Sequence, residues 1–194
     1  MLNLPWEHQH NWVYNRRMSI ASQHPCLERM GALLHYKRGN IASRVVRTMK
    51  FHRRLDLATW MGRLAVEQLR ETGLFDGVEC IVPIPLTRAR EHYRGFNQAL
   101  LMGEAMATEL GIGVCNALQR IRETESQTHF RAAQRMENAK DIFRLTEVAQ
   151  QLRGQSVMIV DDVMTTGRTM LSAIEELEKV PDIRLSTFAW AWVP

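Results

Sequence analysis

The stretch Val157–Leu171 constrains the fold more than any other part of the chain. It begins with four apolar residues, Val157–Val160, which are typical of a strand buried on both faces. Two carboxylates, Asp161 and Asp162, follow where we expect that strand to end. A threonine-rich turn comes next, and a helical pattern then runs on to Leu177. This order of strand, acidic pair, turn and helix predicts a ligand site at the carboxyl edge of an open α/β sheet.

The turn in this stretch has the chemistry of a phosphate site. It carries three threonine hydroxyls and can aim several backbone N–H groups at one point, and the helix behind it adds the positive end of its dipole. Gly167 permits the close approach of a ligand that a side chain would block. We therefore assign phosphate binding to Thr165, Thr166, Gly167, Arg168 and Thr169.

Two better-known phosphate chemistries do not fit the spacing. A nucleoside-triphosphate P-loop needs G-x-x-x-x-G-K-[ST], and the sequence has no such run. An aspartyl phosphatase would carry a second carboxylate two residues after Asp161, where Val163 stands.

Strand and helix patterns alternate along the rest of the chain. We expect strands over 29–36, 78–84, 114–118, 143–145 and 183–192, and helices over 40–51, 56–72 and 97–110. This alternation favours an α/β fold with a mostly parallel open sheet flanked by helices. Residues 1–35 are expected to form a small N-terminal arm or partial hood, and residues 36–194 one main domain.

The helix over 40–51 is expected to have two unlike faces. Asn40 can cap it, and an apolar stripe forms one side, made of Ile41, Val45, Val46 and Met49. Basic residues lie roughly along the other side: Arg44, Arg47, Lys50 and Arg54. The second helix, expected over 56–72, is predicted to bury a set of its own apolar residues: Leu57, Trp60, Met61, Leu64 and Leu69.

Charge and cysteine content narrow the class of protein. Residues 1–60 hold ten Lys and Arg against three Asp and Glu, a balance of +7, whereas the whole chain carries +4. Three isolated cysteines without a C-x-x-C spacing argue against a zinc site and suit a reducing compartment. No apolar run approaches the ~18 residues that a membrane span needs. We expect a cytoplasmic protein without a membrane segment.

Two further segments are candidates for the site. Residues 87–98 place three arginines in a loop after the strand at 78–84, which suits a second anionic group: Arg88, Arg90 and Arg94. Residues 119–141 are polar with few apolar anchors and form either a solvated loop or a lid. The lid candidates within that segment are Ser126, Gln127 and Thr128.

Two sets of motifs carry a family resemblance. Residues 160–169, Val-Asp-Asp-Val-Met-Thr-Thr-Gly-Arg-Thr, resemble the phosphoribosyl-pyrophosphate (PRPP) motif of type I phosphoribosyltransferases. Over roughly residues 36–192 the chain resembles the ComF family, phosphoribosyltransferase-like proteins linked to bacterial DNA uptake. The motifs that carry this are Tyr36-Lys37-Arg38-Gly39, Met49-Lys50-Phe51, Val82-Pro83-Ile84-Pro85, Arg94-Gly95-Phe96-Asn97-Gln98, and Ser126-Gln127-Thr128 with Arg135 and Asn138. Many ComF proteins begin with a four-cysteine zinc ribbon, which is not found here, and arginine at 168 stands where a small residue is commoner.

The resemblance implies roles for the candidate residues. Asp161 and Asp162 would face the ribose hydroxyls and act in catalysis, and Thr165–Thr169 would hold the 5′-phosphate. Arg88, Arg90 and Arg94 are candidates for pyrophosphate binding. Mg²⁺ would bridge pyrophosphate oxygens and water, with no direct side-chain ligation.

Two functions stay open at this point. One is a phosphoribosyltransferase that moves ribose 5-phosphate from PRPP to a nitrogen acceptor and releases pyrophosphate. The other is a non-catalytic accessory protein of DNA uptake that senses PRPP or a nucleoside monophosphate. It would bind single-stranded DNA, through the face of Arg44, Arg47 and Arg54, or a competence helicase. The alternative for the basic face is an ordinary solvated surface. The sequence does not identify the nitrogen acceptor of the transferase. A homodimer is a further expectation.

Overall fold

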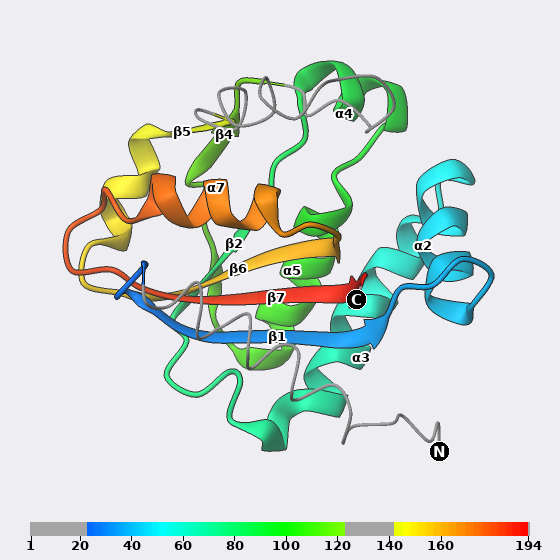
Figure 1. Cartoon of the computed structure of the whole chain (residues 1–194), viewed down its shortest axis with the longest axis horizontal. Coiled ribbons are helices and arrows are strands. Elements are labelled where there is room, and N and C mark those ends of the chain that lie inside the picture. Colours follow the sequence, from blue (N-terminus) through cyan, green and yellow to red (C-terminus); the bar gives the residue numbers. More distant parts are fainter. Residues whose placement is uncertain (1–22, 123–141, 194) are drawn as a thin grey trace.

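The computed structural model describes residues 23–122 and 142–193. Its centre is a five-stranded parallel sheet with the order β1-β7-β6-β2-β3 (Figure 1). The strands are β1 (Leu27–His35), β2 (Cys80–Pro83), β3 (Gly113–Val114), β6 (Ser156–Met164) and β7 (Arg184–Trp192). The predicted α/β fold with a parallel sheet is confirmed. A separate antiparallel pair joins β4 (Leu118–Arg120) to β5 (Phe143–Leu145).

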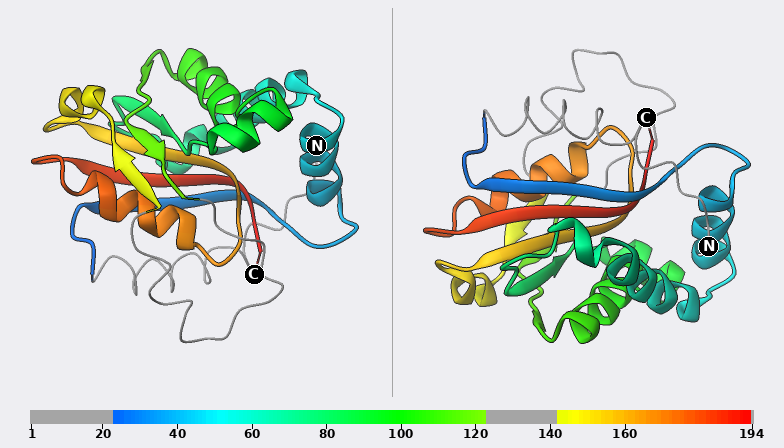
Figure 2. Two further views of the ribbon diagram at one scale, coloured as in Figure 1. Left: turned by 90° about the horizontal axis from the view of Figure 1, so that it is seen from above. Right: turned by 90° about the horizontal axis from the view of Figure 1, so that it is seen from below.

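Helices cover both faces of the sheet (Figure 2). The helices are α2 (Ile41–Phe51), α3 (Leu55–Leu69), α4 (Arg88–Arg94), α5 (Gln98–Leu110) and α7 (Arg168–Leu177), with 3₁₀ turns η1 (Arg70–Thr72) and η2 (Glu147–Leu152). α7 lies on one face, and α3 and α5 lie on the other, while α2 stands beyond the carboxyl ends of β1, β7 and β6. α2 and α4 therefore belong to the edge where a ligand site of this fold forms.

The apolar run at the start of β6 explains the two-layer packing. All four of its residues, Val157–Val160, are fully buried. Side chains alternate between the two faces of a strand. Accordingly Val157 and Ile159 belong to the cluster that includes α7, whereas Met158 and Val160 belong to the cluster with α3 and α5. The predicted strand buried on both faces is confirmed.

Local signals fix where the helices begin and how closely they pack. The side chain of Asn40 accepts a hydrogen bond from the backbone N–H of Ser43 at 2.9 Å, which starts α2 as predicted. Gly62 lets α3 approach α5, because a Cβ atom at that position would lie 2.3 Å from the carbonyl oxygen of Met102. The contact at Gly62 sets how closely α3 and α5 pack on one face of the sheet.

Several predicted elements differ from the observed ones. β6 does not end before the acidic pair but continues to Met164, because its ladder with β7 runs on to Trp192. The basic segment expected as a loop contains the helix α4. The strand expected over 114–118 is two strands, β3 and β4.

Some side chains expected in the core are not buried. Ile41 is 63% exposed and Trp60 is 45% exposed, so neither belongs to the apolar faces predicted for their helices. Leu57 and Leu64 are only partly buried. In their place, small residues such as Ala42 and Ala58 face the core, which brings both helices close to their neighbours.

β1 lies within the segment 1–35 that was expected to form an arm or hood. It is an edge strand of the main sheet and pairs with β7 over its length. Residues 1–22 lie outside the described residues, so the arm itself stays a prediction. Within the described ranges, no helix is both long and apolar enough to span a membrane.

Candidate active site

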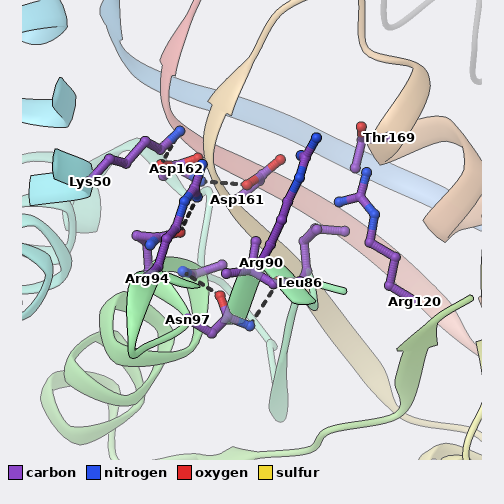
Figure 3. A pocket seen from close by; sticks show the side chains of 12 residues that line it. Lys50, Leu86, Arg90, Arg94, Asn97, Arg120, Asp161, Asp162 and Thr169 are labelled. Atoms are coloured by element: carbon purple, nitrogen blue, oxygen red, sulfur yellow. Dashed lines mark hydrogen bonds and ion pairs between the residues drawn. The ribbon is translucent and has the colours of Figure 1, made fainter. Parts of the chain in front are cut away.

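A pocket of about 130 Å³ opens at the carboxyl edge of the sheet (Figure 3). It lies where β2 and β6 end, and α2, α4, α5, β4 and α7 each contribute to its wall. Most of its lining is polar or charged. The lining residues are Lys50, Ile84, Leu86, Arg90, Arg94, Asn97, Gln98, Ala99, Arg120, Asp161, Asp162 and Thr169.

The acidic pair forms the floor of this pocket. The backbone N–H of Asp162 donates to Asp161 Oδ1 at 2.8 Å, which fixes the first carboxylate against the chain. Asp162 is only 7% exposed, and its Oδ2 atom lies 2.7 Å from the ammonium group of Lys50. In Figure 3 Asp161 lies on the side of Arg90, and Asp162 lies on the side of Lys50 and Arg94.

The first carboxylate of the pair has a perturbed pKa. Burial, and then the neighbouring charge of Asp162, raise the pKa of Asp161 to about 7, and Lys50 opposes this shift. Perturbed carboxylates of this kind gather at functional sites, although structural networks also produce them. Near neutral pH Asp161 can therefore hold a proton.

Cationic side chains surround the pair. Arg90 and Arg94 reach in from α4, and the guanidinium of Arg94 donates to Gln98 Oε1 at 2.8 Å. Arg120 comes from β4, with its guanidinium carbon 5.6 Å from the centre of the Phe143 ring. Together with Lys50 they give four cationic groups against two carboxylates, so the pocket is suited to an anionic ligand. Arg88, the third predicted arginine, is exposed on α4 and does not line the pocket.

The threonine-rich turn lies beside the same pocket. Thr165 and Thr166 are exposed, and Gly167 has the left-handed backbone conformation (φ 78°) that precedes α7. Arg168 is the exposed first residue of that helix, and Thr169 in its first turn lines the pocket. The start of α7 thus contributes Thr169 to the pocket that holds the acidic pair.

The pocket contains residues that were not predicted as site residues. Lys50 was placed on the solvent face of its helix, but it points inward to Asp162. The motif Met49-Lys50-Phe51 was the signal that could have identified it. Arg120 was counted only as part of the polar segment 119–141. The lid candidates Ser126, Gln127 and Thr128 lie outside the described residues.

Asn97 and Gln98 also line the pocket, and both are buried. Asn97 holds two elements together, because its Oδ1 atom caps α5 and its Nδ2 atom donates to the carbonyl oxygen of Ile84 at 3.1 Å. It therefore fixes the segment after β2 against α5. Among the described residues, no group of three or more His, Cys, Asp or Glu is placed to hold a metal ion.

Comparisons with known proteins identify a matching family model and related chains. The family model "Phosphoribosyl transferase domain" matches residues 97–181. The DNA utilization protein YhgH of Salmonella typhimurium is 38% identical over 133 residues, which cover 66% of this chain and 57% of that protein. Competence protein F of Haemophilus influenzae is 30% identical over 166 residues, which cover 84% of this chain and 72% of that protein. The chain thus matches little more than half the length of the Salmonella protein.

Solved structures with a similar arrangement include adenine phosphoribosyltransferase from Leishmania tarentolae. It is 13% identical, with a TM-score of 0.47, and the match covers 83% of this chain and 91% of that chain. Another is adenine phosphoribosyltransferase from Saccharomyces cerevisiae, 18% identical with a TM-score of 0.43, covering 71% of this chain and 68% of that chain.

Proposed function

Because this chain belongs to the ComF family of phosphoribosyltransferase-like proteins, we propose that its pocket binds PRPP and transfers the ribose 5-phosphate group to a nitrogen acceptor. One observation carries this proposal. The acidic pair and Thr169 of the phosphate turn line the same pocket as three arginines from other elements. Hydroxyl acceptors, a phosphate turn and a cationic wall are the three parts that PRPP requires.

Each part has a role in the proposed reaction. The bond from the anomeric carbon to a pyrophosphate oxygen breaks, and a bond from that carbon to the acceptor nitrogen forms. Asp161 and Asp162 accept hydrogen bonds from the ribose hydroxyls, and the turn Thr165–Thr169 holds the 5′-phosphate. Arg90 and Arg94 bind the departing pyrophosphate, a role that for Arg88 stays a prediction. Catalysis is then mainly positioning and electrostatic stabilisation of charge.

Mg²⁺ is the cation of the proposed complex. Because Mg²⁺ prefers hydrated oxygen coordination, it would enter this complex with the pyrophosphate group of the ligand. There it would offset charge on the leaving group.

A paired binding and turnover assay tests the proposal. PRPP with Mg²⁺ should raise the melting temperature, because a ligand of the folded state stabilises it. The double variant Asp161→Asn/Asp162→Asn should lose that shift but stay folded. The matched control is Asp56→Asn/Asp76→Asn, which alters two exposed carboxylates outside the pocket. An unchanged PRPP shift in the first variant would remove the assigned role of the acidic pair.

Pyrophosphate release separates the two functions that the sequence left open. The parent protein is incubated with PRPP, Mg²⁺ and, in turn, each common nucleobase or ammonia. Release that depends on one acceptor supports the transferase. PRPP binding without release under any of these conditions supports a sensing protein.

The outer face of α2 favours a second candidate function, the binding of single-stranded DNA. Arg44 and Arg47 are exposed on this face, and Phe51, which shares it by helical spacing, is 68% exposed. Basic and aromatic side chains in alternation suit phosphate contacts and base stacking. Arg54, which was grouped with them, is paired with Asp56 at 2.6 Å, so its charge is partly offset. A helicase partner stays a prediction.

A further inference from the structure

Lys50 joins the outer helix α2 to the bottom of the pocket. Its neighbours Val46 and Met49 are buried, which turns the last turn of α2 toward the sheet. The side chain of Lys50 is 20% exposed, and its ammonium group lies 2.7 Å from Asp162 Oδ2. No other residue of α2 lines the pocket. The helix therefore contributes a single charged group to the site.

The acidic pair poses an electrostatic problem for the proposed ligand. PRPP is a polyanion, and two adjacent carboxylates in a poorly solvated pocket would repel its phosphates. Asp162 is the more buried of the two, and a buried carboxylate without a partner is costly. For Asp161, burial and the charge of Asp162 raise the pKa, whereas Lys50 lowers it. Lys50 is thus the cation placed to offset the charge of this pair.

We propose that Lys50 is a positioning residue, which neutralises and orients Asp162 so that the acidic pair can accept pentose hydroxyls without repelling the ligand's phosphates. This inference rests on the proposed function. One ammonium group leaves lone pairs of the Asp162 carboxylate available, because an ionised carboxylate has about four acceptor sites. Arg90 and Arg94 from α4 and Arg120 from β4 line the same pocket (Figure 3). They bring to the pocket the positive charge that suits a polyanionic ligand.

The competing explanation is that Lys50 only ties α2 to the edge of the sheet. Both explanations predict that a Lys50→Met variant is less stable, so stability alone cannot separate them. The two explanations make different predictions for ligand binding. If Lys50 is only a structural tie, its loss affects ligand binding by moving α2. If it neutralises Asp162, ligand binding lost in Lys50→Met should return when the charge of Asp162 is also removed.

The test compares inorganic pyrophosphate and PRPP as probes, with Mg²⁺, by titration calorimetry at pH 8. The variants are Lys50→Met, Lys50→Arg and Lys50→Met/Asp162→Asn. Lys179→Met is the matched control, because Lys179 forms a similar ion pair with Glu176 on the surface, outside the pocket. We expect Lys50→Met to weaken the binding of both probes by at least about tenfold. The uncompensated charge of Asp162 would repel an anion within the same pocket by more than that factor. Lys50→Arg and Lys179→Met should bind both as the parent does.

The double variant gives the decisive result. Pyrophosphate has no hydroxyls, so Lys50→Met/Asp162→Asn should bind it within about threefold of the parent, as the unpaired charge is gone. PRPP binding should stay weak, because the ionised carboxylate of Asp162, which accepts hydrogen bonds from the pentose hydroxyls, is lost. Two outcomes would overturn the inference: pyrophosphate binding that Lys50→Met leaves unchanged, or a double variant as weak for pyrophosphate as the single one. The second would mean that Lys50 touches the ligand directly.

A measurement without ligand keeps this inference separable from the proposed function. A parent protein that binds neither probe refutes the proposed function, and with it the pentose part of the inference. The pairing itself is then tested by thermal unfolding at pH 8, where Lys50→Met should melt earlier than the parent and the added Asp162→Asn should recover most of the loss. A double variant that melts no later than Lys50→Met would refute the pairing as well.

Discussion

Replacing Asp161 by asparagine should stabilise the folded protein at alkaline pH. The pKa of this carboxyl rises from 3.8 to about 7 on folding. Between these values the folded state binds more protons than the unfolded state, so the free energy of unfolding falls as the pH rises from about 4 to about 7. Above pH 7 the full cost of ionising Asp161 is present. The Asp161→Asn variant does not ionise and escapes this cost.

The size of the effect follows from the shift. About three pKa units correspond to roughly 4 kcal/mol at 1.36 kcal/mol per unit. Asp161 is partly exposed and interacts electrostatically with Asp162 and Lys50. We therefore expect the free energy of unfolding to rise by roughly 2–4 kcal/mol in the variant at pH 8. Asparagine keeps the Oδ1 atom that accepts from the backbone N–H of Asp162. The local turn therefore survives the substitution.

Urea unfolding of the parent and of Asp161→Asn at pH 4.5, 6 and 8 measures this gain. The difference between them should be small at pH 4.5 and grow with pH. Asp76→Asn is the control, because Asp76 is exposed and does not line the pocket. If Asp161→Asn were equal to or less stable than the parent at pH 8, the carboxyl would not be held against its ionisation and the reasoning would fail.

Three further predictions concern the phosphate turn, the outer face of α2 and the core. Arg168→Ala should change ribose 5-phosphate affinity by less than about threefold in a calorimetric titration, because this side chain is exposed and does not line the pocket; a loss of about 1.5–3 kcal/mol would place it on the phosphate. Arg44→Gln/Arg47→Gln should flatten the log–log salt dependence of single-stranded DNA binding by about 1.4, at about 0.7 per phosphate contact. Phe51→Ala should instead weaken that binding by about 1–3 kcal/mol at every salt concentration with the slope unchanged. Gly62→Ala should lower the free energy of unfolding by about 1–3 kcal/mol in urea, since α5 leaves no room for the added methyl group.

Local patterns predicted most of the secondary structure. The run Val157–Val160 identified the central strand, because a strand covered on both faces needs apolar residues at successive positions. Asn40 marked the start of α2 correctly. α4 was missed because it is only seven residues long and has no buried residue, so it lacks an apolar period. Its signals were the cap at Thr87 and the left-handed Gly95 at its end.

The site was predicted less completely than the fold, because its members come together only in three dimensions. Asp161, Asp162 and Thr169 are close in sequence and could be assigned from one motif. The direction of Lys50 depends on which side of α2 packs inward, and that is set by contacts with other elements. Arg120 reaches the pocket because β4 pairs with β5, and nothing near Arg120 in the sequence indicates this pairing.

The place of β7 in the sheet has a consequence for how the protein folds. β7 lies between β1 and β6, although it follows both in the sequence, and the ladder of β1 is made with β7. Among the described strands, β1 therefore has no neighbour until residues 184–192 insert, so the sheet is completed by contacts of very large sequence separation, which form slowly. During that interval none of the other described strands covers the edges of β1. A β7 strand from a second molecule satisfies the same register, so refolding at high protein concentration should produce a strand-exchanged dimer.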